Sequence, residues 1–191
     1  MIIEMPNYIS AEEIASIKEA VAPYANQPTY TYNREGTSVL ISKTPELKNL
    51  DLKLQEIFSR IYGNVIAPRY KPALASADQG YEYHIYKPGE ICHYHLDSEI
   101  AQSTDRSRFQ LRYASVILHL TTNEDGGDLV FPAQKQSVKT EAGKVVVFPP
   151  YGMYGHYTTP SSTPREVIVS WFIYKTATVN LNEDAGIYAA R

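Results

Sequence analysis

The sequence contains one cysteine, Cys92, among its 191 residues, so it cannot form an intrachain disulfide. A disulfide-stapled fold is therefore excluded, and nothing in the composition requires an oxidising compartment. Long apolar runs are also absent: the stretch 167–174 is interrupted by Ser170 and is far shorter than the roughly 20 residues of a membrane helix. The first residues lack the basic segment of a signal peptide. We expect a cytoplasmic protein with no membrane partner.

An excess of charge of either sign is lacking too. The 18 basic and 21 acidic side chains leave a formal net charge of −3. Proteins that grip a phosphate backbone carry a basic face, so nucleic acid is not expected as a partner. A hydrophobic fraction of 43% is enough for a sizeable core. Length and composition predict one globular domain over residues 1–191, and nothing indicates an oligomeric state.

The N-terminal part of the chain carries helical signals. Ser10 and Glu13 form a capping box ahead of apolar residues at helical spacing, which predicts a first helix. An apolar stripe over 45–62 predicts a second helix that ends at Gly63. Between these helices, the segment 30–41 has the composition and central turn of a hairpin.

After residue 80 the pattern changes to short β-type runs separated by Gly, Pro and Asp. These runs cover 81–87, 91–97, 113–121, 128–132, 136–140, 144–148, 155–158 and 166–174. Strands of this length and spacing predict an all-β sandwich or jelly roll. We therefore expect a mainly β fold with N-terminal helices, in which 1–80 form a helical brace and hairpin, 81–175 the β core and 176–191 a tail.

Histidine and aspartate, two types of metal ligand, occupy every second position in the second half of the predicted strand 91–97. Residues i and i+2 share one face of a strand, so His95 and Asp97 are expected to project side by side and to hold one cation. His93 shares that face and is an equal candidate. His156, at the start of a later strand, is a candidate third ligand. Two histidines and one carboxylate form the facial triad of non-haem Fe(II) sites, which leaves positions open for reactants.

Arg165 indicates a second kind of site. A fixed guanidinium near a metal is suited to hold a dicarboxylate by its far end through two parallel hydrogen bonds. A protein that only binds metal has no need of such an anchor. The arginine therefore favours an enzyme over the alternative of a non-catalytic, cupin-like binding protein.

These residues belong to a longer series of motifs. In chain order the series reads Tyr86-Lys87-Pro88-Gly89, His95-Leu96-Asp97, GGDLVFP over 126–132, GKVVVF over 143–148, His156, Arg165 and Trp171-Phe172. The series resembles the Fe(II)- and 2-oxoglutarate-dependent dioxygenases, specifically their prolyl 4-hydroxylase-like branch. The resemblance implies a double-stranded β-helix core, which is a cupin-like jelly roll, braced by about two helices.

The resemblance also implies roles for individual residues. His95, Asp97 and His156 match the ligands of Fe(II), and Arg165 matches the residue that pairs with the distal carboxylate of 2-oxoglutarate. Tyr86 matches a tyrosine whose hydroxyl reaches the same co-substrate.

Four further positions match less closely. His119 falls where some relatives place a tyrosine that assists the arginine, and a buried core histidine is an equal alternative. Trp171 and Arg112 match positions near the substrate, for which core packing and a surface salt bridge are the alternatives. Cys92 stands where relatives that hydroxylate proline often carry a tyrosine, which puts proline as the target in question but leaves the iron site intact.

The activity implied by the resemblance is hydroxylation of a C–H bond by O2 and 2-oxoglutarate, supported by ascorbate, with release of succinate and CO2. The expected substrate is a prolyl residue of a peptide or protein. A small molecule or free amino acid, hydroxylated on the same iron site, is the alternative. The segments 98–110 and 30–41 are candidates to border the substrate. The alternative for 98–110 is a solvated loop, and the alternative for 30–41 is an edge hairpin with no role.

Overall fold

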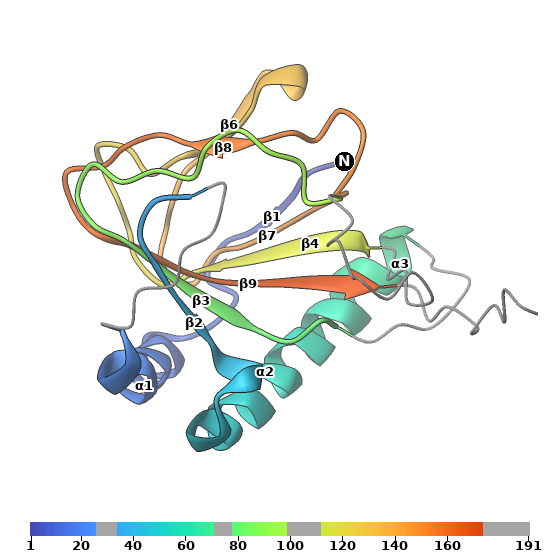
Figure 1. Ribbon diagram of the computed structural model, residues 1–191. Helices are drawn as coiled ribbons and strands as arrows, with labels where there is room; N and C mark the ends of the chain where they lie inside the picture. Colours follow the sequence, from blue (N-terminus) through green and yellow to red (C-terminus); the bar gives the residue numbers. More distant parts are fainter. Residues whose placement is uncertain (26–33, 71–77, 99–111, 174–191) are drawn as a thin grey trace, which may run out of the picture.

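Two antiparallel sheets face each other in the computed structural model, which describes residues 1–25, 34–70, 78–98 and 112–173 (Figure 1). The strands are β1 (Ile3–Met5), β2 (Thr37–Leu40), β3 (Glu82–Tyr86), β4 (Arg112–His119), β5 (Leu129–Phe131), β6 (Gln136–Val138), β7 (Val145–Phe148), β8 (Tyr157–Thr158) and β9 (Arg165–Ile173). The helices are α1 (Ala11–Val21), α2 (Lys48–Ile61) and α3 (Ala67–Tyr70). Short 3₁₀ segments cover Ala22–Tyr24, Ile41–Lys43, Pro45–Leu47 and Pro132–Gln134.

The larger sheet has six strands in the order β1-β7-β4-β9-β3-β2, and the smaller one has the order β6-β5-β8. Figure 1 shows α1 and α2 on one side of the larger sheet and the small sheet on the other. This arrangement confirms the predicted jelly roll with N-terminal helices. β1 was not predicted; it pairs with β7, with Glu4 opposite Val146.

The two predicted helices are present, but the second does not end as expected. The capping box of Ser10 and Glu13 is formed in both directions, as predicted. Gly63, by contrast, does not end α2, because the chain continues through a π-helical turn, Tyr62–Ile66, into α3. The reason is packing: Val65 and Ile66 are both buried and extend the apolar face of the helix past the glycine.

Two other predictions need revision. The segment 91–97 is not a strand, because its only pairings in the described chain are isolated bridges from Cys92 to Arg34 and from His95 to His156. The predicted hairpin 30–41 is described only from Arg34 onward, and its second half forms β2, which pairs with β3. The predicted loop 98–110 lies outside the described residues apart from its first residue, and the tail 176–191 lies outside them entirely.

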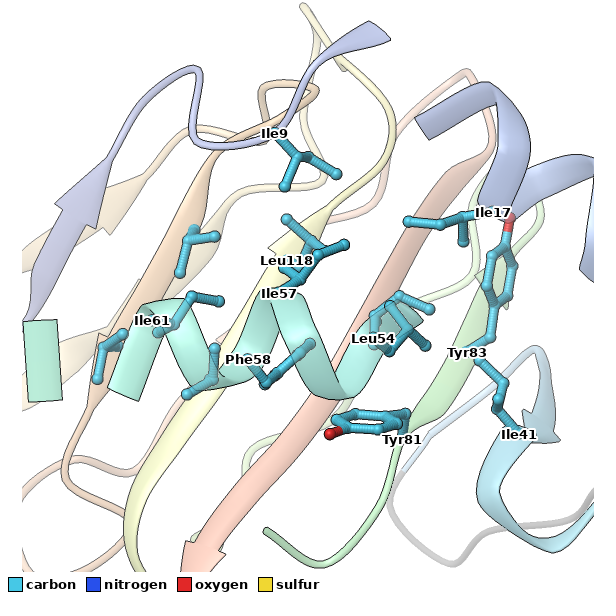
Figure 2. Close-up of a cluster of buried hydrophobic side chains, with 14 of the residues drawn as sticks. Ile9, Ile17, Ile41, Leu54, Ile57, Phe58, Ile61, Tyr81, Tyr83 and Leu118 are labelled. Carbon is cyan, nitrogen blue, oxygen red and sulfur yellow. The ribbon is translucent and has the colours of Figure 1, made fainter. Parts of the chain in front are cut away.

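The main hydrophobic core lies between the larger sheet and the helices (Figure 2). Leu54, Ile57, Phe58 and Ile61 form the buried stripe of α2, and they pack together with sheet residues such as Leu118. Through this core the six-stranded sheet packs against the helices. No helix within the described ranges is long and apolar enough to cross a membrane.

The space between the two sheets holds a second cluster. Alternate residues of a strand face opposite sides, and Val167, Val169 and Trp171 of β9 belong to this inner cluster, whereas Ile168 and Phe172 belong to the helix-side core. Arg165 shares the inner phase of β9. A polar residue on this inner face is therefore placed inside the barrel.

Replacing Ile57 by valine is expected to lower the free energy of unfolding by about 1 kcal/mol, because one buried methylene is lost from a site that is 2% exposed. Urea denaturation followed by circular dichroism measures the change. Leu52→Ala on the same helix is the control, since Leu52 is 49% exposed and its truncation is expected to cost less than about 0.5 kcal/mol. An equal loss of unfolding free energy in the two variants would contradict the placement of Ile57 in the core.

Candidate functional site

Three side chains with metal-binding atoms converge where two chain segments meet. His95, Asp97 and His156 each offer one ligand atom, and these atoms all lie within 4.8 Å of one another. Nε2 of His95 is 3.3 Å from Oδ1 of Asp97. Asp97 and His156 are buried, and His95 is largely so. Within the described residues, this is the one group of three such ligands.

Backbone contacts orient both histidine rings. The N–H of His95 donates to the carbonyl oxygen of His156, and the N–H of His156 donates to that of His95, both at 3.0 Å. Nδ1 of His95 lies 2.8 Å from the carbonyl oxygen of His93, and Nδ1 of His156 lies 3.1 Å from that of Tyr154. When Nδ1–H donates to these carbonyls, Nε2 keeps its lone pair for a cation. The donor set fits Fe(II) with open coordination positions.

His93 does not belong to the cluster. Its side chain is 55% exposed and lies 3.6 Å from Glu35. The expectation that His93 shares a face with His95 is wrong, because it assumed regular strand alternation over 91–97. The chain instead bends at Tyr94, between the two bridged positions.

The electrostatics of the cluster favour a cation. Burial raises the pKa of Asp97, but the hydrogen bond with His95 and the charges of His156 and His95 outweigh it and hold the pKa well below its usual range. Burial lowers the pKa of His156. For His95, burial acts downward, but Asp97 and Cys92 raise its pKa to about 10, so a metal ion that binds Nε2 would displace a proton from this ring. The ionised, buried carboxylate is thus available to a metal ion.

Arg165 lies inside the barrel at the start of β9. Its side chain is buried, its Nε donates to Oγ1 of Thr140 at 3.4 Å, and its guanidinium carbon lies 5.1 Å from the centre of the Tyr86 ring. Burial lowers its pKa, and the partners that raise it again are Tyr86 and Cys92 rather than a carboxylate. A buried guanidinium without a carboxylate partner in the described chain fits an anionic ligand.

His119 is a second buried polar group near this arginine. It is fully buried on β4, and neither ring nitrogen has a hydrogen-bond partner among the described residues. Burial, and then the charges of Arg165 and Lys144, lower its pKa well below the usual value, so the ring is neutral. Tyr86, whose pKa is raised by burial, lies opposite Arg165 in the β3–β9 register. Together Arg165, Tyr86 and His119 form a buried polar cluster suited to a carboxylate.

The glycine pair of the GGDLVFP motif lies close to other parts of the chain, and Gly127 lies beside Arg165. Gly126 has φ +151°, and a Cβ there would collide with the carbonyl oxygen of Pro160. Gly127 has φ +71°, and a Cβ would lie 3.3 Å from Cδ of Arg165. At both glycines the backbone therefore lies too close to its neighbours for a side chain, and Gly127 leaves space for the side chain of Arg165.

Arg112 and Trp171 lie together beside the metal cluster. The guanidinium carbon of Arg112 is 3.8 Å from the centre of the Trp171 ring, and Nη1 of Arg112 donates to the carbonyl oxygen of Asp97 at 2.8 Å. Nε of Arg112 donates to Oε1 of Gln79 at 2.6 Å. The partners of Arg112 in the described chain are thus a ligand backbone, an amide and an aromatic ring.

Cys92 is also brought to the cluster. Its Sγ is 3.6 Å from Nδ1 of His95, and its side chain is buried. Its N–H donates to Oγ1 of Thr158 at 2.8 Å, and its carbonyl accepts from the N–H of Thr158. Cys92 thus anchors the first ligand segment to β8.

Sequence reasoning missed a charged group on the inner side of β3. Glu82, His84 and Tyr86 occupy alternate positions of the strand, and therefore share one face of it. Nε2 of His84 is 3.0 Å from Oε2 of Glu82. Arg34 contacts the His84 ring and pairs with Glu82 at 3.3 Å. The alternation of His84 with Tyr86 was the available signal. Thr140, the contact of Arg165, had no signal because it lies after β6, outside any helix, strand or sequence motif.

Acid is expected to destabilise the protein partly through His84. Burial, then the charge of Arg34, lower its pKa from 6.5 to about 4, although Glu82 acts in the opposite direction. The folded state therefore binds fewer protons than the unfolded state between these values. The stabilising contribution is present above about pH 6.5 and is lost as the pH falls toward 4. Urea denaturation at about pH 7 and 4.5 should show a smaller loss in His84→Gln than in the wild type; equal losses would contradict this.

Comparisons with known proteins agree with these features. Residues 81–173 match the model of the 2OG-Fe(II) oxygenase superfamily. A PKHD-type hydroxylase of Shewanella sp. strain MR-7 is 28% identical over 181 residues, which cover 90% of this chain and 77% of the relative. The related protein of Shewanella sp. strain ANA-3 is 26% identical over 179 residues, with the same coverage.

Solved structures share the fold. A viral collagen prolyl hydroxylase from Paramecium bursaria Chlorella virus-1, in complex with 2OG, superposes with a TM-score of 0.64 at 16% identity, covering 91% of this chain and 96% of that one. A Pseudomonas putida prolyl-4-hydroxylase gives a TM-score of 0.61 at 19% identity, covering 92% and 93%.

Proposed function

Because this chain belongs to the 2OG-Fe(II) oxygenase superfamily and uses Fe(II) and 2-oxoglutarate, we propose that it hydroxylates a prolyl residue of a peptide or protein. The observation that carries the proposal is the pairing of two sites. The ligand cluster of His95, Asp97 and His156 lies in the same barrel as the buried Arg165, which has no carboxylate partner among the described residues. Solved relatives with this fold include prolyl hydroxylases, one of them in complex with a peptide fragment.

Two groups of residues would bind different ligands. His95, Asp97 and His156 would hold the iron, and Arg165, with Tyr86 and His119, would hold the distal carboxylate of 2-oxoglutarate. When bound, this pair supplies the oxidant that inserts one oxygen atom of O2 into a C–H bond, while the other oxygen leaves in succinate with release of CO2. The inner apolar cluster excludes water from the reacting atoms.

The proposal is tested first with the co-substrates alone and then with a peptide added. Purified protein supplied with Fe(II), ascorbate and 2-oxoglutarate should release succinate slowly without substrate. Addition of a proline-containing peptide should accelerate the release and add the mass of one oxygen atom to the peptide. Absence of both 2-oxoglutarate binding and succinate release would overturn the proposal.

A small molecule or free amino acid is the second candidate, because Cys92 puts a prolyl target in question. This small side chain packs against His95 where relatives that hydroxylate proline often have a tyrosine. A panel of free amino acids that includes L-proline, offered in the same assay, distinguishes the two candidates. Because Cys92 is the sole cysteine and iron must stay reduced, we place the enzyme in the cytoplasm.

Arg112 is expected to position Asp97. Its replacement by methionine removes the hydrogen bond to the Asp97 carbonyl but keeps most of the packing on Trp171. Loss of a group that orients a ligand costs about 10-fold to 100-fold in metal affinity, so iron(II) binding should weaken about tenfold. Titration with Fe(II) under anaerobic conditions measures it. Arg60→Met, at an exposed ion pair with Glu13, is the matched control and should bind as the wild type does.

A further inference from the structure

The side chain of Arg34 points into the barrel. It is 10% exposed, pairs with Glu82 at 3.3 Å and contacts the ring of His84. Glu82 and His84 share the face of β3 that carries Tyr86, a member of the inner cluster. Burial raises the pKa of Glu82, but His84 and Arg34 outweigh it and lower the pKa to about 2, so the carboxylate is ionised. Arg34 and Glu82 therefore form a charged pair on the inner face of the sheet.

The backbone of the same segment holds the chain that leads to the metal ligands. Arg34 forms an antiparallel bridge with Cys92. The N–H of Glu35 donates to the carbonyl oxygen of Ile91 at 3.0 Å, and the N–H of Ile91 donates to Oε2 of Glu35 at 2.9 Å. Cys92 is also bonded to Thr158 of β8. Residues 91–92 are thus fixed by two neighbours, the Arg34 segment and β8.

This fixation bears on His95, which follows Cys92 by three residues. The segment 91–97 pairs within the described chain only through isolated bridges, so no continuous ladder of hydrogen bonds sets its position. Sγ of Cys92 lies 3.6 Å from Nδ1 of His95, and a shift of residue 92 therefore reaches the imidazole. A metal ligand has to be held within about 0.5 Å of its working geometry. The support for His95 must come from outside its own segment, and Arg34 provides part of it.

Stability alone does not explain a charged pair at this place. Apolar side chains of the same volume are often as stabilising as a buried ion pair, or more so. A guanidinium and a carboxylate provide one defined arrangement instead, because the donors of the guanidinium form a rigid fork. The role that remains for the pair of Arg34 and Glu82 is to fix a position.

We propose that Arg34 is a positioning residue of the iron site: Glu82 and His84 hold its guanidinium, and its backbone then fixes residues 91–92 and, through them, His95. Arg34 acts through the protein chain and is not itself a ligand. This role goes beyond the proposed function, because it is the same whichever substrate is hydroxylated. It also assigns a purpose to the charged group on the inner side of β3.

The test measures metal binding without turnover, by anaerobic titration with Fe(II) and by the visible absorption of the Co(II) derivative. Arg34→Met keeps most of the apolar stem but removes the charge and the fork of donors. Loss of a group that orients a ligand costs about 10-fold to 100-fold in metal affinity, so Fe(II) should bind about tenfold more weakly and the Co(II) spectrum should change. Arg34→Lys keeps the charge without the fork and should recover part of the affinity.

Lys144→Met is the matched control. The Lys144 side chain is 6% exposed and pairs with Glu4 at 3.4 Å, so its replacement also breaks a largely buried charge pair. This pair links β1 to the residue before β7 rather than to the ligand segment 91–97. Urea denaturation should show a lower free energy of unfolding for Lys144→Met, whereas its Fe(II) affinity and Co(II) spectrum should match those of the wild type.

A double-mutant cycle tests the part of Glu82. If Glu82 acts by holding Arg34, then Glu82→Gln should weaken Fe(II) binding, and the double variant should bind no more weakly than Arg34→Met alone. Glu82→Gln preserves the shape of the side chain, so together with Arg34→Lys it decides the question even if Arg34→Met does not fold. Circular dichroism establishes which variants are folded.

Three results would overturn the role of Arg34. They are wild-type Fe(II) affinity in the folded Arg34 and Glu82 variants, an equal loss of affinity in Lys144→Met, and fully additive losses in the cycle. A wild type that binds no Fe(II) would overturn the iron site and this role with it. A wild type that binds Fe(II) but hydroxylates no peptide would contradict the proposed function and leave the positioning role standing.

Discussion

Replacement of Asp97 by alanine is expected to lower the affinity for iron(II) at least about a hundredfold and to reduce succinate release to background. Loss of groups that merely orient a ligand already costs about 10-fold to 100-fold, and Asp97 is the sole carboxylate of the cluster. The variant would also leave His95 and His156 without the anion that lies beside them. Anaerobic Fe(II) titration and a succinate assay measure the two effects.

His93→Ala is the control for this experiment. His93 lies two residues from His95 but points to solvent and pairs with Glu35. Its removal should leave iron binding within about twofold of the wild type, as for most exposed substitutions. If His93→Ala abolishes iron binding and Asp97→Ala retains it, the ligand assignment is wrong.

This contrast shows what the sequence could predict about the site. Donor types alone left His93 and His95 as equal candidates, and the resemblance to the dioxygenases selected His95, Asp97 and His156, whose ligand atoms the structure brings together. The reasoning about strand faces failed. It treated 91–97 as a regular strand, whereas the bend at Tyr94 turns His93 outward and leaves His95 bridged to His156.

The fold was predictable in its class but not at every boundary. Strand lengths and turn residues predicted the jelly roll, because alternation and turn chemistry are local properties. The residues that follow α2 could not be predicted from local sequence alone. The chain stays helical past Gly63, since the burial of Val65 and Ile66 outweighs the preference of glycine for a helix end. The pairing of β1 with β7 joins distant segments and left no local signal.

The buried neighbours of Arg165 illustrate the same limit. Thr140 and His119 reach the arginine only because β4 and β9 pair and the chain folds back after β6. Neither residue has a spacing to Arg165 that sequence alone interprets. The resemblance placed His119 near the co-substrate, and the structure adds that its ring nitrogens have no partner in the described chain.

Arg165→Ala is expected to weaken 2-oxoglutarate binding at least about thirtyfold, with iron(II) binding retained. Removing one partner of a buried, hydrogen-bonded charge pair costs about 2–5 kcal/mol, and the guanidinium is buried with no competing carboxylate in the described chain. Calorimetric titration of the iron-loaded protein with 2-oxoglutarate measures the loss.

Arg165→Lys separates charge from geometry. Lysine keeps the positive charge but offers a point charge instead of two parallel donors, so it should recover only part of the affinity. The predicted order is therefore wild type, then lysine, then alanine, while Fe(II) affinity stays the same in all three because Arg165 is outside the group of ligand atoms. Equal affinity of the alanine variant for 2-oxoglutarate would remove Arg165 from the co-substrate site, whereas loss of iron binding together with it would show that the arginine supports the barrel rather than the ligand.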